Sequence, residues 1–248
     1  MRKVVSFIVD YFDRFRLQKI SRNFINLISR KNYAHGLDWF GVQIFQTPTD
    51  LFLYQQLIFR ARPNVIIETG VAKGGSILFA CQMLDLLHGP SNSNSWRVIC
   101  SDKNSMREAE DVINMFGFKN NVIFFQGDSA SHSFKELIDQ NLLKMNSPRI
   151  LVSLDSNHTE DHVFNELNSL ADLVSPNSYA IVWDSRIGDL SRLTHYLRPR
   201  SWNKKKHAGT GVLKFLKLES NHSKFKVERD LELNLIISGT HYGILQRK

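Results

Sequence analysis

Apolar residues between residues 65 and 183 fall into short continuous runs separated by longer stretches in which they recur every three or four residues. The short runs predict buried strands at 65–67, 97–100, 122–125, 149–154 and 179–183. The longer stretches predict helices at 75–88, 104–116, 130–143 and 160–174. Strands that alternate with helices form right-handed βαβ units around a parallel sheet covered on both faces. The pattern therefore predicts an α/β fold.

The chain on either side of this alternation carries other patterns. Residues 1–31 place Val, Ile, Phe and Leu mostly three or four positions apart with Arg and Lys between them, which predicts one or two amphipathic helices. Residues 32–47 resemble an aromatic-rich loop, and Thr47 followed by Pro48 predicts the start of a helix ending near Ala61. Residues 210–218 predict a helix, and 233–237 with 242–246 predict a closing antiparallel hairpin. We divide the chain into an N-terminal helical appendage and loop, 1–47, and a main domain, 48–248.

Composition excludes several classes of protein. Hydrophobic residues make up 42% of the 248 residues, so a globular domain with a full core is expected. Only Cys81 and Cys100 are present, which argues against a disulfide framework and suits a reducing cytoplasm. No apolar run reaches the ~18 residues of a transmembrane helix. Asp10 and Asp13 interrupt the short apolar start that imitates a signal peptide, so we expect a cytoplasmic protein.

The formal net charge of +8 is concentrated at residues 1–31 and 198–207. No basic–aromatic module or zinc-finger spacing accompanies it, so a nucleic-acid partner is not expected. A solvated surface explains the charge, and an anionic acceptor or membrane surface is the alternative. For residues 1–31 the alternatives are packing on the domain, packing on a partner subunit in a homo-oligomer, or peripheral contact with the inner membrane.

Glycine and carboxylate signals follow three successive strands. The first strand is followed by Glu68-Thr-Gly-Val-Ala-Lys-Gly-Gly-Ser76, whose glycine spacing matches neither a dinucleotide fingerprint nor a P-loop. Asp102 ends the second strand and suits the hydroxyls of a ribose, and Gly127-Asp128-Ser129 follows the third. Because these strand ends meet at one edge of a parallel sheet, they predict a binding site for S-adenosylmethionine. The expected contacts are Glu68, Gly70, Ala72, Gly74, Gly75, Ser76, Asp102, Gly127, Asp128 and Ser129.

The fourth strand ends in the polar run 155–162, which contains two histidines. Asp155 and His158 are the candidate catalytic residues, with His158 as a base because its ordinary pKa lies near 6.5. His162 follows at i+4, so both rings could share one face of a helix. In the competing interpretation, Asp155 or Asn157 caps the next helix and both histidines are solvated near its start.

These strings resemble the cephalosporin hydroxylase (CmcI-like) family over roughly residues 32–248. The resemblance rests on Gln46-Thr-Pro-Thr-Asp50, Ile67-Glu-Thr-Gly-Val-Ala-Lys-Gly-Gly-Ser76, Gly127-Asp-Ser129 and Leu154-Asp-Ser-Asn-His-Thr-Glu-Asp-His-Val163. It implies a Rossmann-like class I methyltransferase fold with a mainly parallel seven-stranded sheet and a closing antiparallel strand. The hairpin predicted above agrees with that topology.

The resemblance also implies a divalent metal, usually Mg²⁺, held by acids after the fourth and fifth strands. Asp155 matches the first position and Asp184 the second. Trp183 stands where the family pattern usually has another acid, so the metal site is weakened here or borrows His158.

The function implied is S-adenosylmethionine-dependent O-methylation of a saccharide or secondary metabolite. A hydroxyl is a poor nucleophile, so the reaction needs alignment with the donor methyl and a base or metal that removes the proton. We expect residues 198–207 to form a mobile loop over the acceptor pocket, facing an acceptor that is nucleotide-linked or lipid-linked. The alternatives are a non-catalytic binding protein with a cofactor fold, and a hydroxylase, as the family name suggests. No convincing 2-His-1-carboxylate spacing supports the hydroxylase.

Overall fold

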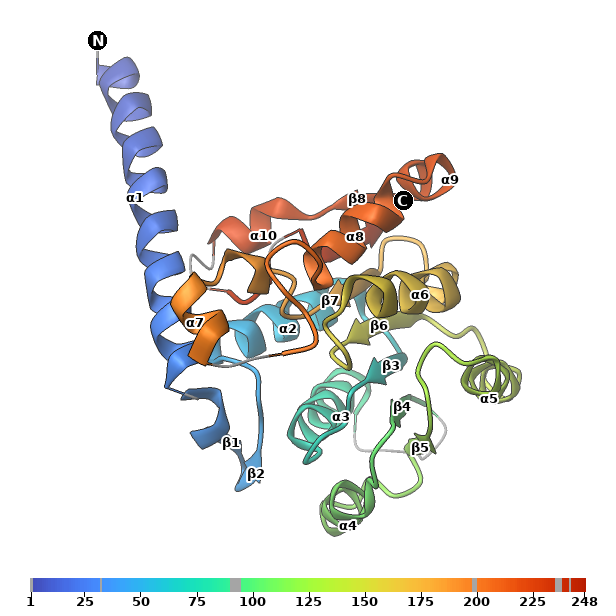
Figure 1. The fold of residues 1–248 in the computed structure, drawn as a ribbon. Coiled ribbons are helices and arrows are strands. Elements are labelled where there is room, and N and C mark those ends of the chain that lie inside the picture. Colours follow the sequence, from blue (N-terminus) through green and yellow to red (C-terminus); the bar gives the residue numbers. More distant parts are fainter. Residues whose placement is uncertain (1, 32, 90–94, 198–199, 235–237, 241) are drawn as a thin grey trace.

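The computed structural model describes residues 2–31, 33–89, 95–197, 200–234, 238–240 and 242–248. Its centre is a seven-stranded sheet of order β5-β4-β3-β6-β7-β9-β8 (Figure 1). The strands β3 to β7 run parallel, whereas β9 is antiparallel to both of its neighbours. The bounds are β3 Val65–Thr69, β4 Arg97–Asp102, β5 Val122–Gln126, β6 Ile150–Leu154, β7 Tyr179–Val182, β8 Phe225–Val227 and β9 Ile244–Arg247. This confirms the predicted α/β class with a mostly parallel sheet.

Two hydrophobic cores lie on the two faces of the sheet. Successive strand residues point to opposite faces, so Ile66 joins one core while Val65 and Ile67 join the other. The first core is covered by α2 (Pro48–Ala61), α3 (Gly75–His88) and α4 (Arg107–Met115). The second is covered by α5 (His132–Leu142), α6 (Glu160–Leu170) and α8 (Ala208–Leu216). The strands read as continuous apolar runs because helices bury both faces.

The closing hairpin was predicted with the wrong first strand. The partner of β9 is β8, and Leu233 and Asn234 belong to the helix α10 (Arg229–Asn234). Residues 235–237 lie outside the described part of the chain. A short helix α9 (Glu219–Lys224) precedes β8, and a 3₁₀ turn η2 (Ala171–Leu173) follows α6, which ends earlier than predicted. The start of α2 is confirmed, since Thr47 Oγ1 accepts a hydrogen bond from Asp50 N at 3.3 Å.

The N-terminal residues form one long helix, α1 (Arg2–Arg30), that extends away from the sheet (Figure 1). Residues 32–47, expected to be a loop, include a turn η1 (Tyr33–Gly36) and a small antiparallel pair, β1 (Asp38–Trp39) and β2 (Val42–Gln43). The segment after β7 also contains a turn η3 (Ile187–Asp189) and a short helix α7 (Arg192–Leu197), which packs against α1. Among the described helices, none combines the length and the hydropathy needed to cross a bilayer.

Candidate active site

A cavity of about 620 Å³ opens at the carboxyl ends of the parallel strands. Strand order reverses beside β3, which pairs with β4 on one side and β6 on the other, and ligands bind at such a point in open α/β sheets. Each parallel strand contributes a predicted residue to the wall, at its end or in the loop that follows, and after β7 that residue is Asp184, with Trp183 beside it. Among the predicted residues, the wall includes Gly70, Ala72, Gly75, Ser76, Asp102, Gly127, Ser129, Asp155, His158 and Asp184.

Gly70 brings two strand-end loops together. Its φ is +84°, and a Cβ atom there would lie 2.1 Å from the backbone oxygen of Asp155. Only glycine allows both that φ and that contact. A Cβ at Gly75 would likewise lie 2.4 Å from the backbone oxygen of Gln43. Gly70 and Gly75 therefore allow neighbouring backbone segments around the cavity to pack closely, and they would also allow a ligand to approach the backbone.

Asp102 is fixed at the wall by the glycine loop. Its Oδ2 accepts hydrogen bonds from the amides of Val71 (3.0 Å) and Ala72 (3.1 Å), and its Oδ1 accepts one from Asn104 N (2.9 Å). A carboxylate has about four acceptor positions, so capacity remains for the hydroxyls of a ribose.

Three predicted cofactor residues stand behind the wall. Gly74, with φ +87°, packs against Ala109. The Glu68 carboxylate is buried and accepts a hydrogen bond from the Tyr54 hydroxyl at 3.1 Å, and burial raises its pKa to about 7. The Asp128 carboxylate accepts from Ala130 N (3.0 Å) and pairs with Lys103 (2.9 Å), and these contacts lower its pKa. Only its neighbours Gly127 and Ser129 reach the cavity.

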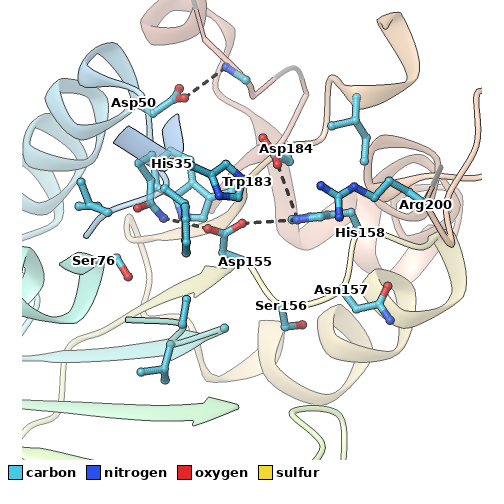
Figure 2. A pocket seen from close by; sticks show the side chains of 18 of the residues that line it. His35, Asp50, Ser76, Asp155, Ser156, Asn157, His158, Trp183, Asp184 and Arg200 are labelled. Carbon is cyan, nitrogen blue, oxygen red and sulfur yellow. Dashed lines mark hydrogen bonds and ion pairs between the residues drawn. The ribbon is translucent and has the colours of Figure 1, made fainter. Parts of the chain in front are cut away.

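Asp155, His158 and Asp184 converge from two loops (Figure 2). One ligand atom of each lies within 4.8 Å of the others. His158 Nε2 stands 3.6 Å from Asp184 Oδ2 and 4.0 Å from Asp155 Oδ1. Burial, and next the charge of Asp184, hold the pKa of Asp155 well above its usual range. The cap of α6 is Thr159, with Asn157 Oδ1 accepting from its amide, so Asp155 is free of the capping role considered from sequence.

Gln46 and Asp50 were not predicted as site residues. Gln46 Nε2 donates to Asp155 Oδ2 at 2.8 Å, which fixes the orientation of that carboxylate. The buried Asp50 accepts from Ser238 Oγ (2.6 Å) and Thr47 Oγ1 (2.7 Å), and burial raises its pKa. Both lie in the string 46–50, which the sequence analysis interpreted only as a helix start within the family resemblance.

His162 does not share a helix face with His158, because His158 precedes the first residue of α6, and His162 is not solvated as the competing interpretation expected. Its Nε2 lies 3.1 Å from Ser129 Oγ, 3.0 Å from Ser156 Oγ and 3.4 Å from Glu166, and only 12% of its side chain is exposed. Burial alone would lower its pKa, but the hydrogen bond and charge of Glu166 outweigh burial, and the pKa is raised. His162 therefore stabilises the cofactor end of the cavity instead of joining the two aspartates.

At Trp183, where the family pattern usually has another acid, this chain has an indole ring that is held by two contacts. Its Nε1 donates to Ser153 Oγ at 2.8 Å, and its ring packs edge-on against Tyr54 with 5.5 Å between centroids. The two remaining carboxylates, Asp155 and Asp184, are supplemented by the imidazole of His158.

Within the described part of the basic loop 198–207, the residues that reach the cavity are the first three, 200–202. Arg200, Ser201 and Trp202 line the wall, and Arg200 points into it (Figure 2). Lys204, Lys205 and Lys206 are exposed away from the wall, and residues 198–199 lie outside the described part of the chain.

Comparisons with known proteins agree with this architecture. The chain is 27% identical over 167 residues to a rhamnosyl O-methyltransferase of Mycobacterium bovis, an alignment that covers 63% of this chain and 62% of that protein's length. A CmcI apo-structure gives a TM-score of 0.58 at 19% identity, covering 86% of this chain and 76% of the other. A CmcI structure with Mg and SAM gives 0.56 at 15% identity, covering 86% and 77%. At these identities the structural likeness shows the shared fold.

The family comparison covers nearly all of the domain. The family described as "Rhamnosyl O-methyltransferase/CmcI" matches residues 31–248, which include each string quoted above and leave out the whole of α1. The chain belongs to the rhamnosyl O-methyltransferase/CmcI family.

Proposed function

We propose that this protein is an S-adenosylmethionine-dependent O-methyltransferase that acts on a hydroxyl of a saccharide or a related secondary metabolite. The observation that carries the proposal is the continuity of one cavity from Asp102 and Ser129 to the Asp155–His158–Asp184 group. In such a cavity a donor at the glycine loop would lie beside an acceptor hydroxyl at the two aspartates. Family membership supports methyl transfer, and the mycobacterial relatives are named for a rhamnosyl acceptor.

The cofactor end fits a nucleoside with an amino-acid tail. Asp102 would accept the ribose hydroxyls, while Gly127 and Ser129 stand where an adenine edge would lie. The amides at the start of α3, at Gly75 and Ser76, have no partner within their own helix and favour a carboxylate.

Loss of Asp102 should weaken binding of S-adenosylmethionine. We expect Asp102→Ala to raise the dissociation constant about tenfold to a hundredfold, because hydrogen bonds to a charged group contribute roughly 1.5–3 kcal/mol. Calorimetry with S-adenosylmethionine and with its demethylated product measures this. Asp111→Ala, which removes an exposed acid of α4, is the matched control. A wild-type protein that binds neither compound contradicts the proposed function.

The acceptor end fits a divalent cation. Burial, and next the charges of Asp184, Glu68 and Asp50, raise the pKa of Asp155, and a bound cation would relieve that repulsion. Asp155 and Asp184 would hold it through oxygen, with His158 at their side. A bound divalent cation supplies Lewis acidity that lowers the pKa of a coordinated hydroxyl. Apolar and aromatic side chains around this end, among them Phe45, Trp183 and Trp202, offer surface for a sugar ring.

Within this arrangement we assign His158 as the base that accepts the acceptor hydroxyl proton. His158 is 23% exposed and lies between the two carboxylates, which orient its ring and would stabilise the imidazolium. Asp155 is in turn oriented by Gln46. The protein thus aligns the hydroxyl, accepts its proton and keeps the reacting atoms out of bulk water.

A His158→Gln variant distinguishes a role of His158 as the base from a role as a metal ligand. As a base, His158 should contribute about 10²–10⁴-fold to kcat, and its loss should lower kcat by that factor. The affinity for Mn²⁺, measured by electron paramagnetic resonance, should change less than about threefold, because the two carboxylates remain. The exposed His132→Gln is the control. A large loss of Mn²⁺ affinity would instead make His158 a ligand.

A further inference from the structure

The C-terminal half of α1 forms one wall of the acceptor end of the cavity. Ile25, Ile28 and Ser29 line it. The helix is held there by Ser21, which is fully buried and accepts a hydrogen bond from Arg186 Nη1 at 3.0 Å. Asn26 Oδ1 accepts another from the amide of Ser191 at 2.5 Å. This part of α1 is therefore an integral side of the pocket.

The outward face of the same helix is apolar and exposed. Leu17, Ile20, Phe24 and Leu27 are spaced three or four residues apart, so they share one face, and they are 37%, 58%, 42% and 51% exposed. Nearer the N-terminus of α1, Phe12 and Phe15 are also exposed, at 57% and 66%. The neighbouring helix α7, which lies against α1 in Figure 1, carries exposed Leu193, Tyr196 and Leu197. A gathering of exposed apolar side chains on one helix face marks an interaction surface.

The positive charge of residues 1–31 favours an anionic binding partner for α1. Residues 1–31 contain eight basic and two acidic side chains. Arg16, Lys19 and Arg30 are exposed and recur at a spacing that places them on a face beside the apolar one. A second copy of the chain would bring these cations against one another, which is unfavourable. An anionic lipid surface would neutralise them while it buries the apolar face.

We propose that α1 lies on an anionic membrane surface and thereby presents the acceptor end of the cavity to a saccharide carried at that surface. The second half of this inference rests on the proposed function. Because one helix contacts the bilayer with its outer face and walls the pocket with its inner face, a sugar attached to a headgroup reaches Asp155 without leaving the interface. The acceptor class that follows is a lipid-linked saccharide.

Sedimentation of the full chain with vesicles tests the docking. Wild type should bind phosphatidylcholine vesicles that contain phosphatidylglycerol, should not bind phosphatidylcholine alone, and should dissociate at high salt. We expect Ile20→Gln/Phe24→Gln/Leu27→Gln and Arg16→Gln/Lys19→Gln/Arg30→Gln each to lower the partition coefficient at least about tenfold. The matched control, Leu86→Gln/Met115→Gln/Leu143→Gln, removes apolar side chains that are 79%, 74% and 87% exposed elsewhere and should bind like wild type.

Three results would overturn the docking proposal. The first is a wild-type protein that does not bind the anionic vesicles, and the second is a control variant that loses binding as strongly as the α1 variants. The third is light scattering that shows the apolar α1 variant converting a dimer to a monomer with vesicle binding unchanged, which would assign this face to a second copy. Vesicle binding does not depend on methyl transfer. A chain that binds S-adenosylmethionine but no vesicles thus refutes the docking alone, and the converse result refutes the proposed function alone.

Discussion

Asp155→Asn should reduce kcat for methyl transfer about a thousandfold while leaving the affinity for S-adenosylmethionine nearly unchanged. Asp155 lies near the proposed base, with its Oδ1 4.0 Å from His158 Nε2. Its Oδ2 accepts a hydrogen bond from Gln46 Nε2 at 2.8 Å. Removing its charge weakens the proposed cation site and takes away a carboxylate that orients the base. Base catalysis and metal activation each contribute several powers of ten, so their joint loss is large.

The measurement is steady-state turnover of a rhamnosyl or related acceptor, with cofactor affinity from calorimetry. Asp172→Asn, which removes an exposed acid paired with Lys224, serves as the control and should leave kcat within about twofold. Mn²⁺ affinity should fall together with turnover, because Asp155 and Asp184 are the carboxylates of the proposed site. An Asp155→Asn protein that turns over at the wild-type rate would show that these carboxylates are not part of the chemistry.

The central sheet could be predicted from sequence because its strands are buried on both faces. Runs such as Val65-Ile-Ile67 are then apolar without interruption, and the signals at their ends mark the site. The C-terminal edge was less predictable. Residues 233–237 are rich in β-branched and apolar side chains and favour a strand locally, yet β8, with the short sequence Phe225-Lys-Val227, takes the place beside β9. Which segment pairs with β9 depends on contacts between residues far apart in the sequence, and a local pattern of residues cannot predict such pairing.

In the site, too, some residues could be predicted from local sequence and others could not. The order of strand-end signals placed Asp102, Ser129, Asp155 and Asp184 around one cavity. The contacts of His162 with Ser129 and Ser156 join two loops and could not be predicted from spacing. One feature of the sequence could have indicated the buried position of His162's partner. Glu166 lies three residues after Val163 and four before Leu170, on the apolar face of α6, and it is fully buried. A carboxylate on a buried helix face needs polar partners, and His162, one turn earlier, is the obvious one.

The burial of Glu68 predicts a pH effect on the free energy of unfolding. Burial raises its pKa from 4.5 to about 7, with hydrogen bonds from Ser76, Tyr54 and Ser153 opposing that rise. Between these two pH values the folded protein holds a proton that the unfolded chain has lost. The folded state therefore binds more protons, and the free energy of unfolding falls as pH rises through this window. The contribution is fully present below pH 4.5 and is lost above about pH 7.

Glu68→Gln should abolish this dependence and stabilise the protein at high pH. The shift corresponds to about 3 kcal/mol, since one pKa unit equals about 1.4 kcal/mol. Glutamine keeps an acceptor for the Tyr54 hydroxyl and carries no charge, so the variant should gain stability over wild type between pH 5 and 8, with the gain reaching about 3 kcal/mol at pH 8. Urea unfolding at several pH values measures it, with the exposed Glu219→Gln as the control, for which the difference from wild type should not vary with pH. If Glu68→Gln and wild type lose stability in parallel from pH 5 to 8, Glu68 is already ionised in the folded protein, and burial does not raise its pKa.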